Sequence, residues 1–175
     1  MQISPASSFL RVDHLKTLPR EVTEGFIVNY TNTIADPRID AHFFDHLDAQ
    51  RGFLGCAFHY IVKTNGTVEL GRDPLTVSTR SKNHFVRATQ IMIGVVGGLD
   101  HETGKASKTI TKEQEAAVEN LMRLFTDALG VPLAVSSYVS LSADELEQNH
   151  LDHLAAEEEE MLLEDAMNEL ERNKP

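Results

Sequence analysis

The sequence of 175 residues contains no tryptophan and a single cysteine, and its apolar runs are all too short to cross a bilayer. Because Cys56 has no second cysteine to pair with, an intramolecular disulfide is excluded, and its place before an apolar stretch predicts an inert core thiol. The first residues lack the basic and then apolar layout of a secretory signal, so we expect a cytoplasmic protein. The length suits one well-buried domain.

Basic residues are scarce as well, above all near the C-terminus. The chain holds 16 Lys and Arg against 27 Asp and Glu, a net charge of −11. Residues 142–175 hold 12 of the acidic residues and 2 of the basic ones, so the rest of the chain is almost neutral. A strongly acidic segment repels nucleic acid and anionic membranes and suits a basic protein surface. We therefore expect no nucleic-acid or membrane partner, and we expect a protein partner to contact the most acidic stretch, Glu157, Glu158, Glu159 and Glu160.

What the sequence does contain is a hairpin pattern from Phe58 to Arg72, which reads F-H-Y-I-V-K-T-N-G-T-V-E-L-G-R. Aromatic and β-branched residues dominate the first half, as they do in strands. Asn65-Gly66 predicts a tight turn in which both residues take positive φ angles, and the second strand then returns over Thr67 to Leu70.

Hydrophobic periodicity predicts the other elements. Strands are expected at about 25–31, 88–96 and 133–139, helices at about 38–51, 111–129 and 142–172, and an irregular stretch to about residue 87. Thr111 and Gln114 predict a capping box at the start of the second helix. The expected inner residues are Ile39, Phe43, Phe44 and Leu47 of the first helix, and Val118, Leu121, Met122, Phe125 and Leu129 of the second.

These elements predict an α/β fold with a central mixed sheet of about five strands flanked by helices. Three parts are expected: an N-terminal arm over 1–24, the α/β domain over 25–141, and an acidic C-terminal helix over 142–175.

Several blocks of the sequence resemble the N-acetylmuramoyl-L-alanine amidases of the small phage lysozyme type and the peptidoglycan-recognition proteins. The resemblance runs from about residue 26 to about residue 139. It rests on F-I-V-N-Y-T at 26–31, the helix at 38–52, the hairpin, A-T-Q-I-M-I-G-V-V-G-G-L-D at 88–100, and I-T-K-E-Q at 110–114. It implies an amidase-like fold and a phage origin.

The resemblance also implies where catalysis would take place. The resembled enzymes hold zinc with two histidines and a third histidine or cysteine, and a tyrosine assists. The first histidine position is Asn29 here, the second falls at Ser136 and Ser137, and the tyrosine position is Phe58. The third ligand position falls in 140–143, where the sequence is S-L-S-A, and no histidine or cysteine occurs between His101 and His150. Because zinc needs three good ligands, we predict an inactive relative with no catalytic residue, no metal and no cofactor.

One alternative stays open for this site. An active amidase would need a rearranged zinc site, built from His14, His42, His46 or His84. His42 and His46 are spaced for one helical face, where a solvent-exposed amphipathic surface is the plainer interpretation.

The G-R-D sequence that ends the hairpin matches the resembled family, where this region borders the glycopeptide groove. Arg72 and Asp73 are therefore candidate ligand-binding residues, and ordering of the loop is their alternative role. The predicted function is binding of a protein, such as an RNA polymerase or a host factor, or of a peptidoglycan fragment in the former active-site cleft. Some phage members of the resembled family bind and inhibit an RNA polymerase. The acidic helix has a second interpretation, in which it packs on its own domain or pairs two copies in a homodimer.

Overall fold

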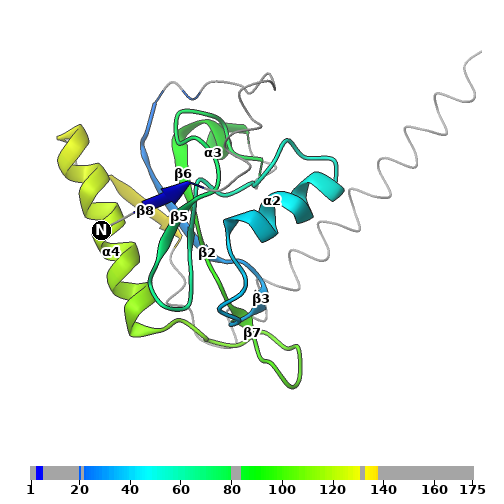
Figure 1. Ribbon diagram of the computed structural model, residues 1–175. Helices are drawn as coiled ribbons and strands as arrows, with labels where there is room; N and C mark the ends of the chain where they lie inside the picture. The colour runs from blue at the N-terminus through cyan, green and yellow to red at the C-terminus, as the bar shows by residue number, and fades with distance from the viewer. Residues whose placement is uncertain (1–2, 6–19, 21, 80–83, 131–132, 138–175) are drawn as a thin grey trace, which may run out of the picture.

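A computed structural model of the chain describes residues 3–5, 20, 22–79, 84–130 and 133–137 (Figure 1). The predicted acidic helix over 142–172 lies outside these residues, and so do Glu157 to Glu160. The boundaries of the arm, the domain and the acidic segment therefore stay predictions.

The central element is a mixed sheet with strand order β1-β5-β4-β6-β2-β8. Only β4 and β5 run antiparallel to each other, and the other neighbouring pairs are parallel. Five of these strands come from the predicted domain, which confirms the mixed sheet, and β1 is an addition from the predicted arm. The bounds are β1 Ile3–Pro5, β2 Gly25–Tyr30, β4 Tyr60–Val62, β5 Val68–Leu70, β6 Gln90–Val95 and β8 Ala134–Ser137.

Two helices cover the opposite faces of the sheet, α2 (Ala41–Gln50) on one side and α4 (Lys112–Leu129) on the other (Figure 1). Successive strand residues point to opposite faces, so β2, β4 and β6 supply side chains to both cores. The α4 side buries Phe26, Val28, Tyr30, Tyr60, Val62, Val68, Ile91, Ile93 and Val95 with Ala117, Val118 and Leu121 of the helix. The α2 side buries Cys56, Phe58, Ile61, Met92 and Val96 with Ala41 and Phe44 of the helix.

The hairpin forms as predicted, but its turn differs from the expected one. Gly66 has φ of +78°, whereas among the described non-glycine residues only Asn32 has a positive φ, so the prediction for Asn65 was wrong. The amide of Gly66 donates to Lys63 O at 2.8 Å, and the amide of Lys63 donates to Thr67 O at 2.9 Å. This is the three-residue hairpin loop in which a single left-handed residue closes the turn.

The predicted helix over 38–51 begins three residues late, because Asp40 caps it by accepting a hydrogen bond from the amide of Phe43. Its inner face was also partly wrong, since the side chain of Phe43 is 43% exposed. Two carboxylates, Asp45 and Asp48, are buried instead. They face the loop that follows the helix, where Asp48 finds a backbone donor in Ala57.

The second helix confirms its predicted cap. Thr111 and Gln114 form a reciprocal capping box, and Gly130 closes the helix with φ of +67°. Its buried positions are Gln114, Ala117, Val118 and Leu121, whereas Leu129 of the last turn is 47% exposed, which the prediction had wrong. The last turn extends past the part of the helix that packs on the sheet.

Three short elements were missed. α3 (His84–Thr89) occupies part of the stretch predicted as irregular, so β6 begins at Gln90 rather than Ala88. β3 (Thr33–Ile34) and β7 (Gly98–Leu99) form a separate two-stranded sheet. None of the helices in the described part of the chain combines the length and the apolar character that crossing a bilayer requires.

Candidate functional site

Asn29 lies near the end of β2, in a row of residues that crosses the centre of the sheet. Its partner on β6 is Gly94, and Gly94 is paired in turn with Ile61 of β4. Val28 and Tyr30, on either side of Asn29, face α4. Asn29 therefore points to the α2 side, where it is partly exposed.

Phe58 packs on the same row. Its side chain is 1% exposed, and its ring meets that of Phe44 edge-on with centroids 6.0 Å apart. A Cβ atom built on Gly94 would lie 3.0 Å from Cγ of Phe58, so the ring occupies the space over that glycine. Gly94 is thus the link between the two predicted positions, Asn29 beside it and Phe58 above it.

Ser136 and Ser137 lie at the end of β8, the strand next to β2. The register pairs Phe26 with Val135 and Ile27 with Ser137, so the ladder is irregular at Ser136. β2 and β8 run parallel, which places their ends at one edge of the sheet. We call this the C-terminal edge, where β2, β4, β6 and β8 end. In open α/β sheets, ligands commonly bind at such an edge.

His59 is fully buried and uses both ring nitrogens. The amide of Met92 donates to Nδ1 at 2.8 Å, so the ring proton sits on Nε2, which donates to Thr76 O at 2.9 Å. Burial lowers the pKa of His59 to about 3. The imidazole is therefore neutral and joins the start of the hairpin to β6 and to the loop at Thr76. These contacts give His59 a packing and orienting role.

Arg72 is only 2% exposed and donates to main-chain carbonyl groups of the loop before the hairpin. Nη2 donates to Leu54 O at 2.7 Å and Nε donates to Cys56 O at 2.8 Å. Burial lowers the pKa of Arg72, although the guanidinium keeps hydrogen-bond acceptors on several sides. The neighbouring carboxylate, Asp73, accepts from the amide of Leu75 at 2.8 Å. These contacts order the loops, and ligand binding by Arg72 and Asp73 stays a prediction.

A buried polar cluster around Arg72 was not foreseen. The carboxylate of Asp48 accepts from the amide of Ala57 at 2.8 Å, and the charges of Asp48 and Asp45 raise the pKa of Arg72 against the effect of burial. The aspartates stand three apart on α2, which a sequence pattern can reveal, but their partner loop and Arg72 come later in the chain. Cys56 lies in the same loop and is buried as predicted, and burial raises the pKa of its thiol to about 12.

Three of the four histidines of the alternative zinc site lie on described helices. His42 and His46 are exposed on α2, where Nε2 of His46 lies 3.1 Å from Nε2 of Gln50. His84 begins α3, and His14 lies outside the described residues. Within the described ranges, no three side chains of His, Cys, Asp or Glu stand close enough together to hold a metal ion.

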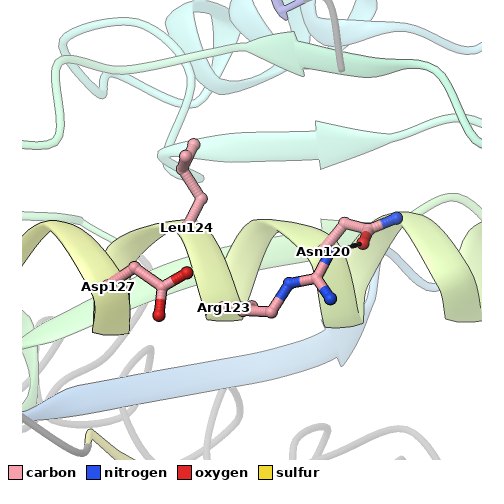
Figure 2. Close-up of a pocket in the computed structure, with 4 residues that line it drawn as sticks. All are labelled: Asn120, Arg123, Leu124 and Asp127. Atoms are coloured by element: carbon pink, nitrogen blue, oxygen red, sulfur yellow. Dashed lines mark hydrogen bonds between the residues drawn. The ribbon is translucent and has the colours of Figure 1, made fainter.

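A hollow of about 380 Å³ lies on the outer face of α4, away from the residues above (Figure 2). Its described lining is one stripe of the helix, Asn120, Arg123, Leu124 and Asp127. Arg123 donates to Asn120 Oδ1 at 2.7 Å, so its charge is directed along the helix.

Known proteins resemble part of the chain in sequence. The endolysin of Enterobacteria phage T3 is 30% identical over 104 residues, which cover 59% of this chain and 67% of that endolysin. The chain belongs to the phage endolysin family. The endolysin of Escherichia phage T7 is 28% identical over 103 residues, which cover 66% of its length. No family model matches the sequence of the present chain.

Solved structures show that this member of the endolysin family has the fold of the amidases and peptidoglycan-recognition proteins. The N-acetylmuramoyl-L-alanine amidase LysC from Clostridium intestinale superposes with a TM-score of 0.59 at 17% identity, over 79% of this chain and 83% of LysC. Bumblebee PGRP-SA gives 0.60 at 16% identity, over 81% and 86%. Peptidoglycan recognition protein-LE, solved in complex with tracheal cytotoxin, gives 0.61 at 15% identity, over 78% and 80%. The fold expected from the sequence is confirmed.

Proposed function

We propose that this member of the endolysin family is catalytically inactive and acts by binding a protein. The inactivity is supported by the side chains that lie beside Gly94 in the central row of the sheet. An asparagine and a buried phenyl ring stand where the family resemblance expects a zinc-binding histidine and a catalytic tyrosine. A neutral amide oxygen is a poor zinc ligand, and Phe58 has no hydroxyl group to stabilise a developing charge.

The neighbouring strand end supports the same conclusion. β8 ends in Ala-Val-Ser-Ser, and the sequence has no histidine or cysteine between His101 and His150. The residues at the C-terminal edge therefore do not fit zinc, which takes thiolate, imidazole or carboxylate ligands. His59, the neighbour of Phe58, is not a substitute base. Its nitrogens are both occupied, and a pKa of about 3 leaves it little tendency to accept a proton at neutral pH.

Binding of a protein is supported by large apolar side chains that solvent reaches near α2. Phe43 on the helix, and Phe53 and Leu54 on the loop after it, are 43%, 45% and 40% exposed. Arg72 donates a hydrogen bond to the carbonyl group of Leu54, and this contact orders the loop. Large apolar side chains exposed on an ordered surface are typical of protein interfaces.

A peptidoglycan fragment is the second candidate ligand. Peptidoglycan recognition protein-LE, which shares the fold, was solved with a monomeric diaminopimelic acid-type peptidoglycan. Binding without hydrolysis would need only the shape and polar groups of the C-terminal edge.

Loss of catalysis is tested with untagged protein. Metal analysis and release of soluble fragments from purified peptidoglycan, with and without added zinc, separate an enzyme from a binder. We expect neither stoichiometric zinc nor fragment release. Zinc bound in a one-to-one ratio together with fragment release would overturn the proposal.

Protein binding is tested by pull-down from bacterial lysate and with purified RNA polymerase. We expect the double variant Phe53→Ser/Leu54→Ser to lose the captured partner, whereas Leu124→Ser on the outer face of α4, where the side chain is 52% exposed, retains it. Equal capture by all three proteins would reject this surface. Calorimetric titration with a muropeptide tests the second candidate, and binding there without any protein capture would replace the first.

A further inference from the structure

Three exposed lysines lie on the connection from β7 to α4. They are Lys105, Lys108 and Lys112, the last of which is the first residue of the helix. The segment 103–112 reads T-G-K-A-S-K-T-I-T-K and contains no acidic residue. In a chain with a net charge of −11, this is a local concentration of positive charge. We call 105–112 the lysine segment.

The lysine segment is held in place by hydrogen bonds at several points. The amide of Asp100 donates to Lys105 O at 2.8 Å, and the amide of Ser107 donates to Gly98 O at 2.8 Å. The hydroxyl of Tyr30 accepts from the amides of Thr109 and Ile110 at 3.1 and 3.0 Å. The three ammonium groups are therefore presented from an ordered backbone, which lowers the entropic cost of binding to them.

Tyr30 also shows where the lysine segment lies. It is the last residue of β2, so its contacts place the segment at the C-terminal edge of the sheet, the lower edge in Figure 1. β8 runs parallel to β2, and its last residue, Ser137, lies at the same edge. The last residue of β8 therefore lies at the edge of the sheet that carries the lysines.

We propose that the acidic segment 142–175 docks on the lysine segment of its own chain. The acidic segment holds 12 Asp and Glu against 2 Lys and Arg, and only residues 138–141 separate it from β8. So short a tether gives the acidic segment a high effective concentration at the edge where the lysines lie. This inference does not depend on the proposed loss of catalysis.

The nearby carboxylates within the described ranges do not form ion pairs with the three lysines. None of the three ammonium groups has a carboxylate of the described residues within salt-bridge distance. The carboxylate of Asp100 accepts from Thr103 and from the amide of Glu102. Glu113 and Glu115 lie in the first turn of α4, where the helix dipole favours negative charge.

Docking of this kind is reversible and sensitive to salt, because exposed ion pairs are weak one by one and are screened by ions. A partner with a basic surface would compete with the lysines for the acidic segment.

The first test is carbodiimide cross-linking of the full chain, which joins amines to carboxylates in direct contact. A mixture of ¹⁴N- and ¹⁵N-labelled protein distinguishes links within one chain from links between chains. We expect links from Lys105, Lys108 and Lys112 to residues 142–175 within one chain at about 0.01 M salt, and their loss at about 1 M salt, where the screening length falls from about 30 Å to about 3 Å. Links only between chains, or links spread evenly over all lysines, would overturn the proposal.

The second test measures amide hydrogen exchange of residues 142–175 and does not depend on lysine chemistry. The variant Lys105→Ser/Lys108→Ser/Lys112→Ser is expected to raise the exchange rate of this segment severalfold at low salt. The matched variant Arg38→Ser/Arg51→Ser/Arg123→Ser removes the same charge from exposed positions elsewhere and is expected to leave the rate unchanged. Equal rates in both variants and in the unaltered chain would refute docking on the lysine segment.

Discussion

The ring of Phe58 packs directly on Gly94, and the contact leaves no room for one more carbon atom. A Cβ atom on Gly94 would lie 3.0 Å from Cγ and Cδ1 of Phe58 and 2.9 Å from Cδ1 of Ile61. Both neighbours are buried to 1% exposure or less, so neither can turn towards solvent. The glycine therefore allows a large aromatic side chain to cover the centre of the sheet beside Asn29.

Gly94→Ala is expected to lower the free energy of unfolding by about 1–3 kcal/mol, because the added methyl group overpacks this contact. Urea unfolding followed by circular dichroism measures the change. Adding Phe58→Leu to the Gly94→Ala variant removes ring atoms from the crowded site and should cost less than the same change in the unaltered chain. If the two substitutions are strictly additive, the ring is not the source of the strain.

The neutral imidazole of His59 makes stability depend on pH. Its pKa is about 3 in the folded protein, against about 6.5 in the unfolded chain, so the unfolded state binds the extra proton between these values. The contribution of this pKa difference to the free energy of unfolding is therefore fully present above about pH 6.5, and it is lost as the pH drops towards 3. We expect a loss of about 2 kcal/mol between pH 7 and pH 5 from this group alone.

Urea unfolding at the two pH values tests this, with His59→Gln and the exposed His46→Gln compared in parallel. The His59 variant should be less stable at pH 7, because the amide of Met92 and the carbonyl of Thr76 lose their partner, but it should lack the acid-dependent loss. The His46 variant should keep that loss. An unchanged pH dependence in the His59 variant would assign the effect to other groups.

The sequence predicts the parts of the fold that depend on near neighbours. Alternating apolar residues reveal β2 and the hairpin because both cores lie on the sheet, and the Thr111–Gln114 box spans only four residues of chain. The turn was predicted only in part, because Asn-Gly is compatible with more than one loop and the structure adopts the one that needs a positive φ at Gly66 alone.

The rest depends on contacts between distant segments. From residue type alone, Phe43 looks like an inner residue of α2 and Asp45 like an outer one. In the structure Phe43 is exposed and Asp45 is buried. The loop at 54–57, to which Arg72 is hydrogen-bonded, comes later in the chain than either residue. The site shows the same limit. A family resemblance singled out Asn29 and Phe58, but the register through Gly94 that brings them together is not written in any local pattern.

Arg72 should be hard to replace even by another cation. The lysine of an Arg72→Lys variant would offer one ammonium group in place of a fork that reaches Leu54 O and Cys56 O together. We expect a loss of about 3 kcal/mol, because hydrogen bonds to a buried charge are lost and carbonyl groups remain unpaired. Urea unfolding gives the change, and faster amide exchange at 54–57 would locate it. Arg51→Lys, at an exposed position, serves as the control and should change stability by less than about 0.5 kcal/mol.

Gln114 is a fully buried polar side chain that is hydrogen-bonded to three backbone groups. Its Nε2 donates to Val62 O at 3.2 Å and to Val96 O at 3.0 Å, while its Oε1 accepts from the amide of Thr111 at 3.0 Å. One side chain thus joins β4, the end of β6 and the start of α4. Gln114→Ala leaves all three backbone groups without this partner, so we expect a loss of about 2–3 kcal/mol.

Gln114→Glu sharpens the same prediction. The carboxylate keeps the acceptor for Thr111 but cannot donate, and it places a negative charge against the carbonyl oxygens of Val62 and Val96. We expect it to be at least as destabilising as alanine at pH 7, and to recover partly in acid as the carboxyl group takes up a proton that it can donate. Thermal or urea unfolding at both pH values measures this, with the exposed Asn120→Ala as the control. If the glutamate variant matches the unaltered chain at pH 7, the two donor contacts contribute nothing to stability.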